Sequence, residues 1–184
     1  GNTTNQFTPI QLATGVGSVA AGQAHSVILK TDGTLWTTGN NAIGQLGDGL
    51  TANRTSFVQV ASDVASVSSQ CHHTLFVKND GSLWGFGYNT NGQLGDNSTT
   101  HRRSPIPIAT GVTAAWTGEI HSLFLKSDGT LWGMGSNLHG QLGLGTATSS
   151  LVPVQIAAGV SSASASVYHS LILKTDGTVW ATGR

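Results

Sequence analysis

Charged residues are what this 184-residue sequence has least of. Only 9% of its residues are charged, against roughly 25% in an ordinary soluble domain, and eight basic side chains balance eight acidic ones. Proteins that bind nucleic acids take much of their affinity from Lys and Arg side chains that neutralise phosphates. The composition therefore argues against a nucleic-acid partner, and the same shortage argues against a polybasic membrane anchor.

Cysteine and long apolar runs are equally scarce. The single Cys71 excludes an internal disulfide and a cysteine zinc cluster. No apolar run approaches the roughly 20 residues that cross a bilayer, so we expect no membrane contact, and the first residues do not resemble a secretory or transit segment. The many Gly, Ser, Thr and Asn residues favour short strands and tight turns over helices. This polar, weakly charged composition suggests an extracellular or cell-surface location.

What the sequence has is an internal repeat of 48 residues without insertions or deletions. Histidine, tryptophan and an Asp-Gly pair each recur four times at this spacing, and Gly-Gln-Leu-Gly recurs three times. The recurring histidines are His25, His73, His121 and His169, and the recurring tryptophans are Trp36, Trp84, Trp132 and Trp180. The repeat gives units at about 9–56, 57–104, 105–152 and 153–184 in a single domain, with an N-terminal strand within residues 1–12.

Each unit has the pattern of four short β-strands. The apolar run 27–29 is followed by Asp32-Gly33 and a second strand ending at Trp36, which is a hairpin signal because the turn needs a positive φ at glycine. A strand of small residues lies upstream at 16–22, and an alternating strand begins near Pro9, Pro105 and Pro153. Four strands in a unit of this length are typical of a propeller blade. We therefore predict an all-β propeller with four-stranded antiparallel blades.

The unit that runs from His25 to Trp36 and continues to Gly44-Gln45-Leu46-Gly47 resembles the regulator-of-chromosome-condensation repeat. The resemblance extends over essentially the whole chain. It implies a β-propeller, usually with seven blades, and a scaffold that works through protein contacts.

Four units do not make seven blades, and three interpretations of the chain remain open. The chain can be part of a larger ring, half of an eight-bladed ring completed by a second copy, or a closed four-bladed ring. An unclosed arc would expose strand edges, so we expect the ring to be closed by some further strand. Pairing of the first strand with the last hairpin is one way to close it.

The four aligned units separate scaffold from site. A residue present in every unit serves the blade, so we interpret the four histidines and four tryptophans as structural and expect backbone partners for the histidine rings. Neighbouring strand residues point to opposite faces, which prevents His25 from activating Ser26. No acid–base pair can be assembled from such copies. We therefore predict no catalytic residues, no cofactor and no enzymatic activity.

Function is expected where the units differ, above all in the tripeptide before each repeated histidine. These four segments should emerge on one face of the propeller. Trp116 lies outside the tryptophan repeat, where the other units have Ala20, Ser68 and Ser164, so it either fills a packing gap or joins a binding patch. The candidate partner-binding residues are Trp116, Glu119, Ile120, His72, Tyr168 and Gln23.

Two further features receive weaker functional interpretations. Cys71-His72-His73 has metal-ligating side chains, but neighbouring strand residues diverge, so we predict no metal site and an inert thiol. Arg54, Arg102 and Arg103 in the links after Gly-Gln-Leu-Gly are either solvated charges or contacts for an acidic partner. Formal glycosylation sequons begin at Asn2, Asn53 and Asn97.

The leading functional hypothesis is a non-enzymatic module whose variable loops bind a protein partner. Two alternatives stay open: a carbohydrate-binding propeller that recognises a glycan, and a structural subunit that assembles with copies of itself into a homo-oligomeric ring or filament.

Overall fold

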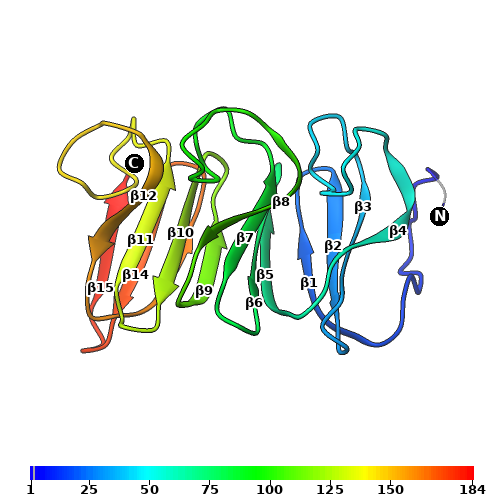
Figure 1. The fold of residues 1–184 in the computed structure, drawn as a ribbon, viewed down its shortest axis with the longest axis horizontal. Helices are drawn as coiled ribbons and strands as arrows, with labels where there is room; N and C mark the ends of the chain where they lie inside the picture. The colour runs from blue at the N-terminus through cyan, green and yellow to red at the C-terminus, as the bar shows by residue number, and fades with distance from the viewer. Residues whose placement is uncertain (2) are drawn as a thin grey trace.

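The computed structural model describes residues 1 and 3–184, and it confirms the predicted all-β architecture of antiparallel blades. The blades follow one another along an arc, and the chain ends lie at opposite ends of that arc (Figure 1). Blade 1 comprises β1 (Val16–Ala21), β2 (His25–Lys30), β3 (Leu35–Gly39) and β4 (Arg54–Ala61). Blade 2 comprises β5 (Val64–Gln70), β6 (His73–Lys78), β7 (Leu83–Gly87) and β8 (Arg102–Ala109). Blade 3 comprises β9 (Val112–Thr117), β10 (His121–Lys126), β11 (Leu131–Gly135) and β12 (Ser150–Ala157), and blade 4 comprises β13 (Val160–Ala165), β14 (His169–Lys174) and β15 (Val179–Gly183).

The central hairpin of each blade is built by the repeated Asp-Gly turn. In blade 1, Gly33 has a φ of 80°, a conformation that costs glycine little. Asp32 Oδ1 accepts hydrogen bonds from the backbone N (3.0 Å) and Oγ1 (2.6 Å) of Thr34, whose Oγ1 accepts a bond from Trp36 Nε1 at 2.8 Å. The Lys30 ammonium lies 4.5 Å from the centre of the Trp36 ring. All four blades repeat this network, so its aspartate, lysine and tryptophan serve the hairpin.

The core of the molecule lies between blades rather than within them. Leu75, Val77 and Leu83 of blade 2 pack against Phe124 and Met134 of blade 3. Similar clusters join blade 1 to blade 2 and blade 3 to blade 4. Each blade is a single sheet with two faces, so it buries its apolar side chains only when a neighbouring blade covers each face.

Buried histidines cross the same junctions. His73 Nε2 lies 2.8 Å from Ser122 Oγ of the next blade, and His121 Nε2 lies 2.9 Å from Ser170 Oγ. His25 Nε2 lies 3.0 Å from Ser69 Oγ. These hydroxyl partners replace the backbone partners that we expected for the rings. The bonds of His73 and His121 span 49 residues and that of His25 spans 44, so none of them joins neighbours in sequence.

The first and last segments of the described chain lack the strand pairing that the other blades have. The described part of the predicted N-terminal strand over residues 1–12 does not form a strand: residues 3–15 contain none, and β1 begins at Val16. The equivalent strands β4, β8 and β12 each pair with the hairpin of the unit before them, and residues 3–12 have no preceding hairpin in this chain. At the other end, β15 is an unpaired edge of a three-stranded sheet. No helix among the described residues is long and apolar enough to span a bilayer.

Candidate functional site

One edge of the arc carries all the variable segments. We call it the loop rim, and it comprises residues 22–24, 70–72, 118–120 and 166–168 with the links 40–53, 88–101 and 136–149. The links form the upper edge of the arc in Figure 1. Each tripeptide accepts a backbone hydrogen bond from the start of its link: Asn40 N donates to Ala24 O at 2.8 Å, and Tyr88 N donates to His72 O at 3.0 Å. The hairpin geometry therefore brings tripeptide and link together on one face.

Blade 2 places an aromatic and histidine cluster on this rim. The Tyr88 ring lies between two histidine rings, with its centre 6.1 Å from that of His72 and 5.0 Å from that of His101. His101 Nδ1 accepts a bond from Asn89 N at 3.1 Å, and burial lowers the pKa of its imidazole. All three rings are half-buried. The cluster thus combines an apolar surface with polar ring atoms, as protein-binding hot spots often do.

A second aromatic contact joins blades 3 and 4 at the rim. The rings of His139 and Tyr168 are 4.8 Å apart at an angle of 67°. Tyr168 belongs to the predicted set, whereas His139 comes from the link of blade 3. Both side chains are exposed. The contact orients the Tyr168 ring without covering it.

Two further rim candidates, Gln23 and Glu119, connect one blade to the next through their backbones. Gln23 N donates to Cys71 O at 2.7 Å, and Glu119 N donates to Ser166 O at 3.3 Å. Cys71 adopts a left-handed conformation with a φ of 52°. Burial and the nearby Glu119 carboxylate raise the pKa of its thiol, which makes it a poor nucleophile.

Trp116 lies on β9 in the blade interior, not on the loop rim. It is half-buried and packs against the apolar cluster that contains Leu123 and Ala163. The equivalent Ser68 instead bonds across the junction to Thr117, through the hydroxyl Oγ1 and the backbone N, each at 3.1 Å. At the next junction the indole supplies apolar contact where a hydroxyl bridge would otherwise form. This location favours the packing alternative for Trp116.

The arginines of the links have structural partners. Arg54 Nε donates to Asp48 Oδ2 at 2.8 Å, and Arg102 forms an ion pair with Asp96 in the next link. Both aspartates are nearly buried, and these hydrogen bonds outweigh desolvation and lower the pKa of each carboxyl group. Arg103 is exposed, and its backbone passes close to Gly44 of the preceding blade. The pairs of Arg54 and Arg102 hold each link against its outer strand.

The buried histidines have no geometry for catalysis. Burial lowers the pKa of His25 and His121 to about 4 and that of His73 to about 3, so these rings are neutral at pH 7. Ser122 Oγ donates to Gln93 O at 2.8 Å, so the His73 ring must donate through Nε2, and its Nδ1 has no partner within the described part of the chain. Among these residues no group of three or more His, Cys, Asp or Glu could hold a metal ion.

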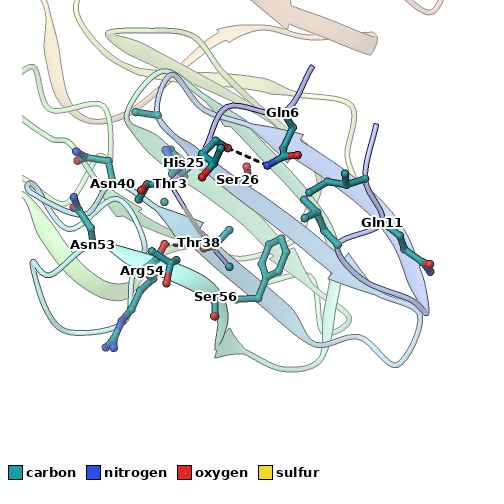
Figure 2. Close-up of a pocket in the computed structure, with 18 of the residues that line it drawn as sticks. Thr3, Gln6, Gln11, His25, Ser26, Thr38, Asn40, Asn53, Arg54 and Ser56 are labelled. Carbon is teal, nitrogen blue, oxygen red and sulfur yellow. Dashed lines mark hydrogen bonds between the residues drawn. The ribbon is translucent and has the colours of Figure 1, made fainter. Parts of the chain in front are cut away.

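A pocket of about 1050 Å³ lies between the N-terminal segment and blade 1. Figure 2 shows Gln6 and Gln11 of that segment and Thr38 and Arg54 of blade 1 among its lining residues. The Gln6 side chain donates to Thr4 O at 3.2 Å. The pocket occupies the side of blade 1 that a preceding blade would cover, so it belongs to the open end of the arc.

Sequence reasoning missed three rim residues, Tyr88, His101 and His139. Each lies at a position where the aligned units carry Asn, Ser, Ile or Arg instead. The criterion that selected the tripeptides, variation between units, would have found them in the links as well. Only the structure shows that tripeptide and link share one surface. The sequon at Asn2 lies outside the described residues.

Comparisons with known proteins agree with this architecture. The family model of the regulator of chromosome condensation (RCC1) repeat matches residues 80–125 and 128–173, and a second model of the same repeat matches residues 17–45. The chain belongs to the RCC1 repeat family. No protein with a curated function matches its sequence.

Solved RCC1-type propellers superpose on this RCC1-repeat chain. Human WBSCR16 is 26% identical over 96% of this chain and 50% of its own, with a TM-score of 0.82. Yeast RCC1 (Prp20), crystallised with Kap60, is 20% identical over 91% of this chain and 43% of its own, with a TM-score of 0.79. A structure of Prp20p from Saccharomyces cerevisiae, described with its binding to Gsp1p and histones, is 19% identical over 92% and 43%, with a TM-score of 0.75. The chain thus spans half or less of each of these proteins.

Proposed function

We propose that this RCC1-repeat chain is a non-enzymatic module that binds a protein partner through its loop rim. The observation that carries the proposal is the cluster of His72, Tyr88 and His101. Tyrosine contributes strongly to protein interfaces because it buries a rigid apolar ring and keeps a polar end.

The repeat itself supports a role for this cluster outside the scaffold. Blade 1 has Ala24, Asn40 and Asn53 in the same three places, and its hairpin has the same contacts as that of blade 2. The three rings of blade 2 are therefore dispensable for building a blade. Their half-buried faces are available to a partner at the edge where the loops vary most.

The solved neighbours support a protein partner as the class of ligand. The RCC1 propeller is generally a protein-interaction scaffold, and the yeast member is described with Kap60, Gsp1p and histones. The present chain has a formal net charge of zero, so its rim suits a partner recognised by aromatic and hydrogen-bonding contacts more than a strongly charged one.

A photo-crosslinking amino acid placed at Thr90, an exposed residue of the same link as Tyr88, tests the proposal. We expect discrete protein adducts from cells of the source organism, and we expect few from the same crosslinker at Thr31, which is exposed on the opposite edge. Equal adducts at both positions would contradict a rim interface. Tyr88→Ala should reduce these adducts, whereas Ser136→Ala, its matched control, should not. Ser136 has the equivalent place in blade 3, and its hydroxyl has no partner among the described residues.

A glycan array separates this proposal from carbohydrate binding. The protein-partner proposal predicts no glycan binding by the wild-type chain. Glycan binding that Tyr88→Ala abolishes would replace the protein partner with a sugar at the same rim. Glycan binding that only Trp116→Ala abolishes would place the sugar site at the inner strand β9 instead.

A further inference from the structure

Among the three described links, only that of blade 2 is closed by a side chain that titrates near neutral pH. In every link the backbone N of the repeated, buried asparagine donates to the side chain of the link's last residue. The acceptor is Asn53 Oδ1 in blade 1, at 2.8 Å, and Ser149 Oγ in blade 3, at 3.0 Å. In blade 2 the backbone N of Asn89 donates to His101 Nδ1 at 3.1 Å. Amide and hydroxyl oxygens keep their lone pairs across the physiological pH range, whereas an imidazole nitrogen does not.

Asn89 holds the link of blade 2 together from its interior. Its side chain is fully buried, and Nδ2 donates to Asp96 Oδ1 at 2.9 Å and to the backbone oxygens of Ser98 and Thr100 at 3.1 Å each. Its Oδ1 accepts a bond from Leu94 N at 2.9 Å. A buried donor that loses its acceptor costs free energy, so the closed link depends on the acceptor of the Asn89 backbone N as well.

The bond between Asn89 and His101 requires a neutral imidazole. Because the Asn89 N–H donates, Nδ1 of His101 holds a lone pair, and the proton of the neutral ring is on Nε2. A second proton would turn Nδ1 into a donor and place two N–H groups opposite each other. Neither Asn53 nor Ser149 can make this change, so acid acts on the closure of one link only.

The charged groups of blade 2 do not compensate a positive charge on His101. Asp96 already accepts from Asn89 and forms the ion pair with Arg102. The other titratable groups of the cluster are Tyr88 and His72. Burial alone lowers the pKa of the His101 imidazole. The closed link therefore favours the neutral ring.

The charged groups of the neighbouring blades have other contacts. The link of blade 1 packs against β8, where it donates a backbone bond to Arg103 O at 2.8 Å, and its Asp48 is paired with Arg54. The link of blade 2 donates to the backbone oxygen of Glu119 in blade 3 at 3.5 Å. The Glu119 carboxylate acts on Cys71, whose thiol pKa it raises. Both neighbours lie within the described chain, so the surroundings of this link do not depend on segments beyond it.

The same imidazole also holds the aromatic cluster of the loop rim. Tyr88 directly precedes Asn89, and the centre of its ring lies 5.0 Å from that of His101 and 6.1 Å from that of His72. We propose that protonation of His101 opens the link of blade 2, displaces Tyr88 and releases the partner from the loop rim at mildly acidic pH. The release rests on the proposed function, whereas the opening of the link is a property of the chain alone.

The sign and size of the effect follow from proton linkage. The His101 ring is neutral in the closed link, and in the open link its pKa returns to the ordinary value of about 6.5. Opening therefore takes up one proton below that pH. The open population should be constant above about pH 6.5 and should rise by up to about tenfold for each pH unit below it.

Hydrogen exchange of the chain alone measures the opening. Between about pH 7 and pH 5.5, we expect residues 88–101 to lose protection relative to the links 40–53 and 136–149, after correction for the intrinsic effect of pH. His101→Asn, which introduces the residue of blade 1, should remove this difference. His139→Asn, which introduces the residue of blade 2 into the link of blade 3, should preserve it. Equal loss of protection in all three links, or an unchanged difference in His101→Asn, would overturn the proposal.

The crosslinker at Thr90 measures the release of the partner. We expect adducts at about pH 7.5 that the wild-type rim loses at about pH 5.5 and that His101→Asn retains. Adducts that persist at pH 5.5 in the wild type, or that both forms lose alike, would overturn the regulation. Absence of adducts at either pH would instead contradict the rim interface, and with it the release, while the exchange experiment would still decide whether the link opens.

Discussion

Strands β6 and β14 have nearly the same sequence and very different surroundings. β6 reads HTLFVK, and its first five residues are all buried. β14 reads HSLILK, and its residues alternate between exposed and buried. The difference comes from the neighbours, because β6 has a blade on each side and β14 has a blade on one side only. Burial in this fold is a property of the junction between blades rather than of the strand.

Lowering the pH should give the largest loss of stability, because buried histidines lie at the blade junctions. His25 and His121, with pKa values lowered to about 4, and His73, lowered to about 3, bind protons in the unfolded chain before the folded one. Stability is therefore complete above about pH 6.5 and falls as the pH drops towards 4, by up to about 1.4 kcal/mol per pH unit for each histidine.

Urea unfolding at a series of pH values measures this dependence. His121→Gln should make the slope shallower because it removes one of the three buried rings. A slope that does not respond to His121→Gln would show that other groups cause the acid sensitivity.

Truncating two equivalent leucines should show that a leucine at a blade junction contributes more to stability than one on an exposed blade face. Leu75→Ala removes a fully buried side chain between blades 2 and 3 and should lower the free energy of unfolding by about 2–5 kcal/mol. Leu171→Ala should cost less than about 1 kcal/mol, because its side chain is already partly in water. Chemical denaturation at low protein concentration compares the two, and equal losses would contradict the junction model.

The ion pair in the links gives the smallest expected change in stability and concerns a single pair of side chains. Blade 3 carries Leu144 and Ser150 where blade 2 carries Asp96 and Arg102. Arg102→Ser alone leaves a nearly buried carboxylate without its ion pair and should cost about 1–3 kcal/mol. Asp96→Leu together with Arg102→Ser reproduces the pairing of blade 3 and should recover part of that loss. A double-mutant cycle from denaturation midpoints measures the coupling, and additive effects would show that the pair is not coupled.

The repeat predicts the blades well and the contacts between them poorly. The 48-residue spacing and the Asp-Gly turns were enough to predict the hairpins, because a turn depends on residues that are close in sequence. The bond from His73 to Ser122 spans 49 residues, so inspection of the adjacent His73-Thr74 pair could not reveal it. The N-terminal strand failed for a related reason, since a strand needs a partner and none of the described hairpins pairs with residues 3–12.

The rim shows the same limit. Glu119, Ile120 and Tyr168 were selected because they vary between units, and the structure places them on the rim. Trp116 was selected by the same criterion, yet it lies on an inner strand and packs between blades. Variation between units identifies positions that are free to change, and only the fold distinguishes a surface from a local change in packing.

The histidine bond from each blade to the next has a consequence for how such proteins can change in length. Each of the three described junctions has a contact between a histidine ring and a hydroxyl 49 residues later in the chain, so inserting or deleting one whole 48-residue unit would preserve this contact at the remaining junctions. Gene duplication of a single unit can therefore lengthen the array without new compensating mutations.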